Sequence, residues 1–114
     1  MNTLPKLGEF EQVVLLAVMR LGPDSYGVAI RKEIEARTGR DVSLGAIYPT
    51  LDRLEAKGFV SSRRGPPTAE RGGRAKRHFR LEPSGAEALR RSWEEFTSLW
   101  KGFEPGPLGE GGEG

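Results

Sequence analysis

The sequence contains no cysteine and a single histidine, His78, among its 114 residues. Without cysteine there can be no disulfide, thiolate metal site or cysteine nucleophile, and one histidine is too few for a histidine-based metal or catalytic cluster. Acids such as Asp52, Glu55 and Glu70 are scattered among basic residues, with no nucleophile or base grouped around them. We therefore expect no enzymatic activity, no cofactor and no metal.

Long hydrophobic runs are also missing. No stretch approaches the roughly 18 apolar residues that a membrane-spanning helix needs, and no charged-then-apolar leader opens the chain. These absences predict a cytoplasmic protein with no membrane contact. A hydrophobic content of 36% in 114 residues is enough for one modest core, which predicts a single compact domain.

Positive and negative charges are unevenly distributed along the chain, although the formal net charge is only +2. Residues 102–114 contain three glutamates and no lysine or arginine, so the rest of the chain carries 18 basic and 13 acidic residues, a net +5. The segment from Arg63 to Arg80 contains seven lysine or arginine residues and a single acidic residue, Glu70. Such a charge run is often only a solvated loop, but here it indicates a polyanionic partner such as nucleic acid.

Apolar periodicity and glycine punctuation predict three helices in the first half of the chain. A largely buried helix is expected over residues 8–21, and an amphipathic one over residues 26–38, with Ser25 as its N-cap and Gly39 at its end. A third helix is expected over residues 43–57, with Ser43 as N-cap and Gly58 after its C-terminus.

The third helix has two unlike faces. Leu44, Ile47, Leu51 and Leu54 recur at three- and four-residue steps and predict a core-facing stripe. The other face has little side-chain bulk near its N-terminal end, which would let the helix approach a partner closely. No acid lies three or four positions from Arg53, so that residue is expected to be unpaired. The members of this second face are Ser43, Gly45, Ala46, Pro49, Thr50 and Arg53.

Two short segments, residues 59–64 and 76–81, read as antiparallel strands joined by a glycine- and proline-rich loop. Helix, turn, helix and basic hairpin follow one another in the order of a winged helix-turn-helix. In that fold the third helix enters the major groove, and the hairpin, or wing, follows the phosphate backbone. The favoured wing contacts are Arg71, Arg74, Lys76 and Arg77, whereas His78 is expected to be a solvent-facing strand residue.

Several ordered motifs resemble the PadR-type transcriptional regulators. They are LGEFE at residues 7–11, SYGVAI at 25–30, SLGAIYPTLDRLEAKGFV at 43–60, ERGGRAKRHFRL at 70–81 and PSG at 83–85. The resemblance implies a dimeric repressor that binds an inverted-repeat operator and is released by a small effector or another signal. Carried over by position, the residues on or near the DNA-facing helix are Ser43, Gly45, Ala46, Tyr48, Pro49 and Arg53, with Tyr26 opening the supporting helix. Tyr48 is ambivalent between helix packing and a phosphate contact, and we favour both, with its ring packed.

A fourth helix is expected from about residue 84 to 101. Leu89, Trp93, Phe96 and Trp100 are spaced four, three and four residues apart, the pattern of a coiled-coil seam, and predict the homodimer interface. Trp93 and Trp100 could also hold a small planar aromatic effector, since some relatives bind such compounds there, but filling the interface is the plainer interpretation.

These expectations define a mainly α fold with a small β-hairpin wing. Residues 1–82 form the winged helix-turn-helix domain, residues 83–101 the dimerisation helix, and residues 102–114 a disordered Gly/Pro/Glu tail. Two alternatives remain open. One is a winged-helix protein-interaction module without specific DNA binding, which the basic wing argues against. The other is a winged-helix regulator of the MarR or ArsR type.

Overall fold

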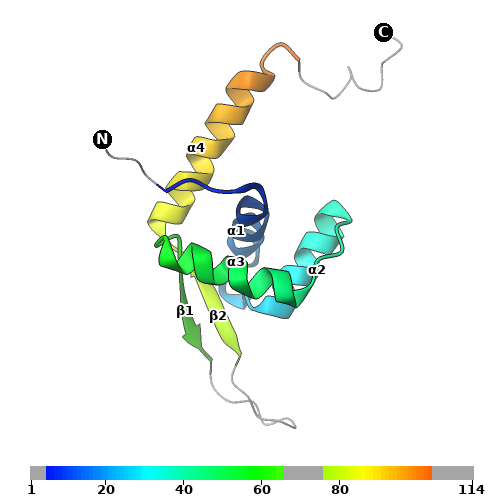
Figure 1. The fold of residues 1–114 in the computed structure, drawn as a ribbon, viewed down its shortest axis with the longest axis vertical. Helices are drawn as coiled ribbons and strands as arrows, with labels where there is room; N and C mark the ends of the chain where they lie inside the picture. Colours follow the sequence, from blue (N-terminus) through cyan, green and yellow to red (C-terminus); the bar gives the residue numbers. More distant parts are fainter. Residues whose placement is uncertain (1–4, 66–75, 104–114) are drawn as a thin grey trace.

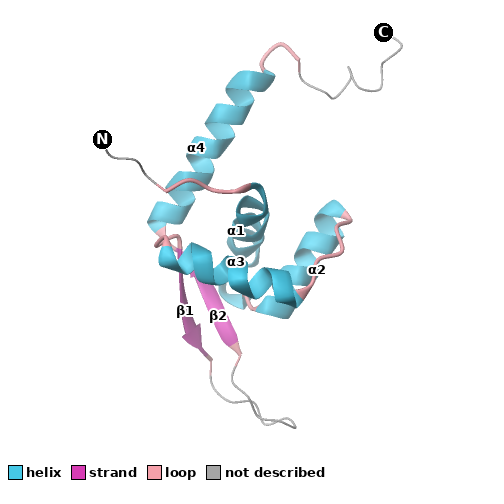
Figure 2. Cartoon of the chain, in the orientation of Figure 1, coloured by secondary structure: helices cyan, strands magenta, loops and turns pink. Residues whose placement is uncertain are grey.

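The computed structural model describes residues 5–65 and 76–103. Four α-helices, one short 3-10 helix and a two-stranded antiparallel hairpin follow one another (Figure 1, Figure 2). The predicted mainly α fold with a β-hairpin wing is confirmed, and the ends of its helices and strands differ from the expected ones by at most one residue. In chain order the elements are α1 (Glu9–Leu21), η1 (Gly22–Asp24), α2 (Gly27–Thr38), α3 (Leu44–Ala56), β1 (Val60–Arg64), β2 (Arg77–Leu81) and α4 (Pro83–Trp100).

The hydrophobic core lies where α1, α2 and α3 meet the base of the hairpin. The predicted α3 stripe is largely confirmed, because Ile47, Leu51 and Leu54 are fully buried and Leu44 is partly buried beside them. Phe79 of β2 closes the core from the hairpin side at 2% exposure. Burial of this apolar surface is the main force that fixes the helices and the wing relative to one another. The other core residues include Val14, Leu15, Val18, Ile30, Ile34, Phe59 and Val60.

The turn into α2 differs from the expectation. Ser25 is not the N-cap of this helix: Tyr26 occupies that position, with an extended backbone. Ser25 is fully buried, and its hydroxyl lies within donating distance of two carbonyl oxygens, that of Val18 at 3.0 Å and that of Gly22 at 2.9 Å. Ser25 therefore ties the end of α1 to the turn instead of capping α2, because one of its acceptors belongs to the last turn of α1 and the other to η1.

Helix α3 begins as predicted. The Ser43 side chain accepts a hydrogen bond from the Ala46 amide at 3.1 Å, which caps the helix. Pro49 lies inside the helix and leaves one carbonyl without its usual donor. Thr50 is a correction: it is 1% exposed, and its hydroxyl donates to the Ala46 carbonyl at 2.8 Å. It therefore packs inward and does not belong to the exposed face of α3.

The hairpin has two distinct faces. Its register pairs Ser62 with Phe79 and Arg64 with Arg77 on the face toward α3, while Ser61 with Arg80 and Arg63 with His78 lie on the other face. The segment before α2 runs along the free edge of β2, since the Phe79 amide donates to the Ser25 carbonyl at 2.8 Å. The wing is thus anchored to the start of α2 as well as to the core.

Helix α4 starts at the base of the hairpin and extends away from the other helices (Figure 1). It begins in close contact with the core, because a Cβ at Gly85 would lie only 2.4 Å from the Phe59 carbonyl oxygen. Leu89 is 8% exposed and belongs to the core, and Ser92 donates to Gln12 of α1. Beyond Ser92, every residue of α4 is exposed.

Candidate nucleic-acid interface

The exposed side of α3 brings together the residues predicted to face DNA. Ser43, Gly45, Ala46, Tyr48, Pro49 and Arg53 are all exposed. The first turn of the helix carries only small side chains there, so its backbone is accessible to a bulky partner. Figure 1 shows α3 crossing the molecule above the hairpin, with α2 beside its N-terminal end.

A groove of about 530 Å³ lies between the start of α2, α3 and the base of the wing. We call it the basic groove. Four of its lining residues are cationic and, in the described part of the chain, none is acidic. Its positive charge and its position beside α3 suit a phosphate backbone running past the helix. The lining residues are Tyr26, Val28, Lys32, Tyr48, Arg64, Lys76 and Arg77.

Tyr48 packs across the start of α2. A Cβ built on Gly27 would lie 2.2 Å from the Tyr48 hydroxyl oxygen, closer than any real contact. Gly27 is therefore needed at this position for Tyr48 to lie as it does. With 37% of its surface exposed, Tyr48 combines a packed ring with an accessible edge, as expected of an aromatic residue with a polar group at one end.

Tyr26 joins the start of α2 to the wing. Its ring meets His78 edge to face, with 5.5 Å between ring centroids, and Lys76 Nζ lies 4.2 Å from the Tyr26 centroid. The interpretation of His78 as solvent-facing is wrong. The residue is half-buried, and its Nδ1 atom is buried without a hydrogen-bond partner within the described ranges. A strand bridge pairs His78 with Tyr26, which accords with the contact between their rings.

Arg77 ties the wing to α3. Its guanidinium lies 2.8 Å from Glu55 Oε1 and 3.3 Å from Asp52 Oδ1, and stacks over the Phe79 ring at 4.8 Å. Its charge is thus largely offset by the two acids of the third helix. Of the wing cations predicted to bind DNA, Lys76 is exposed beside the groove and Arg77 positions the hairpin, while Arg71 and Arg74 lie outside the described residues.

The expectation that Arg53 is unpaired is wrong. Its Nε lies 3.3 Å from Glu11 Oε2 of α1, and its guanidinium donates to the Thr50 hydroxyl at 3.1 Å. The pairing crosses 42 positions of sequence, which a rule based on spacing within one helix does not detect. With its side chain 56% exposed, Arg53 still presents part of its guanidinium to a partner.

Glu11 is the centre of a buried polar cluster behind α3. Its carboxylate accepts from Lys57 Nζ at 2.7 Å and from the Gly8 amide at 2.8 Å, in addition to Arg53. Burial raises the pKa of Glu11, but the hydrogen bonds from Lys57 and Gly8 outweigh it and hold the pKa below its ordinary value. The cluster therefore contains an ionised carboxylate that fixes the C-terminal half of α3 against α1.

The outer part of α4 carries an uncovered aromatic face. Trp93, Phe96 and Trp100 are 70%, 53% and 50% exposed. Leu89, by contrast, is buried within the protomer, so this member of the predicted seam belongs to the core and not to the exposed part of the face. Leu99 and Phe103 also lie in this region, at 75% and 68% exposure. The sequence did not point to these two residues, because they do not fall at the seam positions of the helix.

Lys32 and Arg64 of the basic groove were not singled out from the sequence either. Lys32 looks like an ordinary residue on the polar side of an amphipathic helix, and only the folding of the wing against α2 brings it near Lys76. No helix in residues 5–65 and 76–103 is long and apolar enough to cross a membrane. In the same ranges no group of three or more acidic or histidine side chains is arranged to hold a metal ion.

Comparisons with known proteins agree on the class of protein. The profile of the "Transcriptional regulator PadR-like family" matches residues 15–91. The transcriptional regulator Rv3488 of Mycobacterium tuberculosis is 35% identical over 109 residues, covering 90% of this chain and 97% of that protein. The chain therefore spans nearly the whole length of this relative.

Solved structures show the same fold. A transcriptional regulator of Clostridium thermocellum, Cth-833, superposes with a TM-score of 0.63 at 25% identity, covering 80% of this chain and 82% of that one. A PadR family transcription regulator of Clostridium difficile R20291 superposes with a TM-score of 0.65 at 20% identity, covering 84% and 98%. These are regulators of transcription and not enzymes. With the family profile spanning the three helices, the hairpin and the start of α4, the chain belongs to the PadR-like family of transcriptional regulators.

Proposed function

We propose that this protein represses transcription by binding a palindromic operator as a homodimer. The observation that carries the proposal is the juxtaposition of a small-residue face on α3 with the basic groove beside it. A helix that is slim on its exposed side can enter the major groove, and cations at its flank can contact the phosphates that border that groove.

The roles of the side chains follow from their places. Ser43, Gly45 and Ala46 form the slim end of α3 that approaches the bases. Tyr48, Tyr26 and the cations Lys32, Arg64 and Lys76 line the groove where a phosphate would lie. Arg53 and Pro49 extend the exposed face toward the middle of the helix, and Arg71 and Arg74 are proposed wing contacts outside the described residues.

The aromatic face of α4 supports the homodimer. Trp93, Phe96 and Trp100 expose half or more of their surfaces, and an apolar face of this kind is stabilised when a second copy covers it. A twofold dimer would place two α3 helices about 34 Å apart, one turn of DNA. Trp93 and Trp100 would both lie at such an interface. A small planar effector that binds between the subunits there would cause the dimer to release the operator.

The alternative function is that of a protein-interaction module. The winged-helix fold alone does not distinguish protein binding from DNA binding. The basic groove favours DNA, because its cations border the slim helix face, whereas a protein-binding surface would more often be apolar at its centre. A regulator that acts on the chromosome also accords with the expected cytoplasmic location.

Fluorescence anisotropy with DNA from the region upstream of the protein's own gene tests the proposal. A scrambled duplex of the same composition is the control, and both are titrated at two salt concentrations. We expect tight, sequence-selective binding that weakens as salt rises. Equal binding to both duplexes, or none to either, would reject a specific operator in this region and favour the protein-interaction alternative.

A further inference from the structure

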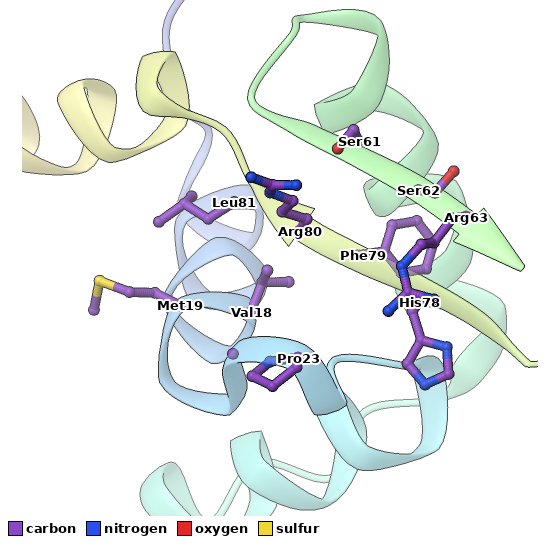
Figure 3. Close-up of a pocket in the computed structure, with 11 residues that line it drawn as sticks. Val18, Met19, Pro23, Ser61, Ser62, Arg63, His78, Phe79, Arg80 and Leu81 are labelled. Atoms are coloured by element: carbon purple, nitrogen blue, oxygen red, sulfur yellow. The ribbon is translucent and has the colours of Figure 1, made fainter. Parts of the chain in front are cut away.

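A second hollow beside the wing shares no lining residue with the basic groove. It has a volume of about 490 Å³, within the range typical of small-molecule sites, and we call it the outer hollow. Its walls come from the end of α1, the turn η1 and the two strands of the hairpin (Figure 3). The lining residues are Val18, Met19, Gly22, Pro23, Ser61, Ser62, Arg63, His78, Phe79, Arg80 and Leu81.

One side of the outer hollow is apolar. Met19 and Pro23 are exposed, and Leu81 is half-buried, so together they offer an accessible hydrophobic surface. Figure 3 shows Met19 on the helix and Pro23 on the turn that follows it. The methionine side chain is flexible and adapts to ligands of different shape. This wall suits a small apolar body.

The other side carries two arginines. The strand register places Arg63 and Arg80 on the same face of the hairpin, diagonal to one another. Both are exposed, and within the described ranges neither has an acidic partner. The nearest acid along β2, Glu82, accepts a hydrogen bond from Ser61 at 2.6 Å and does not line the hollow. Two like charges on one face repel each other, and an anion placed between them would relieve that repulsion.

We propose that the outer hollow binds a small amphipathic anion. Its apolar body would lie against Met19, Pro23 and Leu81, and one carboxylate or phosphate group would lie between Arg63 and Arg80. This site is separate from the aromatic face of α4, because it is built wholly from α1, η1 and the hairpin. It assigns a ligand site to the helix-turn-helix domain itself.

Occupancy of the hollow should weaken DNA binding. The hairpin carries Arg64 on its α3 side and Arg63 and Arg80 on its outer side, and these three arginines contribute to the positive potential of the wing. A bound anion would neutralise part of that potential. This coupling rests on the proposed function, whereas binding of the anion does not.

The binding is tested by titrating the ¹⁵N-labelled full chain with four probes and following its amide signals by NMR. Octanoate and octyl phosphate have both parts of the proposed ligand, octanol lacks the charge, and inorganic phosphate lacks the apolar body. We expect saturable shifts at Gly22, Ser61 and Ser62 with the first two probes, with a Kd about tenfold or more below those of the other two. The tighter of the two amphiphiles identifies the preferred head group.

Two paired variants make the test specific. Arg63→Gln with Arg80→Gln should raise the Kd about tenfold or more, whereas Arg37→Gln with Arg91→Gln, which removes the same charge from α2 and α4, should leave it unchanged. Shifts confined to Trp93 and its neighbours, equal affinity for octanol, or an unaffected arginine pair would each overturn the site.

The coupling is tested separately by measuring DNA affinity with and without saturating octanoate. We expect the Kd for DNA to rise about threefold or more at low salt. An unchanged Kd, with octanoate shown to be bound, would overturn the coupling but not the site. No DNA binding in the absence of octanoate would instead count against the proposed function, while the NMR titration would still decide whether the hollow binds the anion.

Discussion

Gly27 and Tyr48 form a close contact that depends on the absence of a side chain at position 27. Because a Cβ at Gly27 would lie 2.2 Å from the Tyr48 hydroxyl, Gly27→Ala must displace the ring from the start of α2. We expect a loss of about 1–3 kcal/mol in the free energy of unfolding, measured by urea denaturation. In a Tyr48→Ala background the same substitution should cost much less. An equal loss in both backgrounds would contradict the packing of Tyr48 on Gly27.

Glu11 makes the stability of the protein depend on pH. Its pKa is lower in the folded chain than the ordinary value of 4.5. The stabilisation from its ionised form is therefore complete above that value and is lost as the pH falls through the lower folded pKa. We expect Glu11→Gln to lower the free energy of unfolding by about 1–3 kcal/mol at pH 7, because Lys57, Arg53 and the Gly8 amide lose a charged acceptor.

The difference between Glu11→Gln and the unmodified protein should shrink as the pH falls below 4.5 and through the lowered pKa of the folded chain, because the carboxylate is then protonated in the folded and the unfolded state. Urea unfolding across pH 3–7 measures it. Glu9→Gln is the matched control, because Glu9 is exposed and its partner within the described residues is Arg40 on the surface. This variant should differ little in stability from the unmodified protein at any of these pH values. A pH-independent effect of Glu11→Gln would show that its carboxylate is not the stabilising species.

At the level of elements, the basic groove depends on α2 and the wing together. Lys32→Gln with Lys76→Gln should weaken DNA binding by similar amounts for specific and scrambled duplexes, and should reduce the slope of log affinity against log salt by about 2. Arg37→Gln on the far turn of α2 is the control, since it lies outside the groove. Loss of affinity for the specific duplex alone would indicate that these lysines read bases and not phosphates.

The outer part of α4 is the element on which the proposed homodimer depends. Trp93→Glu should convert the dimer to a monomer in sedimentation-velocity experiments, because it places a charge in the centre of the aromatic face. Ser98→Glu adds the same charge on the opposite side of the helix and should leave the dimer intact. If the Trp93 variant still sediments as a dimer, another surface must join the two copies.

The elements themselves were largely predictable from the sequence, and their long-range contacts were not. Apolar steps of three and four residues marked α3, and alternation in residues 76–81 marked β2, because these patterns are local consequences of helix and strand geometry. Glu11 with Arg53, and Arg77 with Glu55, join residues far apart in the chain. Such pairs depend on how the elements pack against one another. The spacing of residues within one helix therefore does not reveal them.

Over the whole molecule, the surfaces proposed to contact DNA and to form the dimer lie on separate elements. The first comprises the exposed side of α3 and the basic groove at the wing, and the second is the aromatic face at the far part of α4 (Figure 1). This separation allows two copies to join through α4 while both α3 helices remain free to contact DNA. The twofold symmetry of the dimer would then require twofold symmetry of the operator.

Hydroxyl-radical footprinting of the upstream DNA tests this account most directly. A homodimer that places its two α3 helices in successive major grooves should protect two symmetry-related half-sites, with centres about 10 base pairs apart or a multiple of that spacing. Trp93→Glu should abolish the paired pattern at protein concentrations where the unmodified chain gives it. A single protected segment without a symmetric partner, or uniform protection along the duplex, would contradict a dimer bound to a palindromic operator.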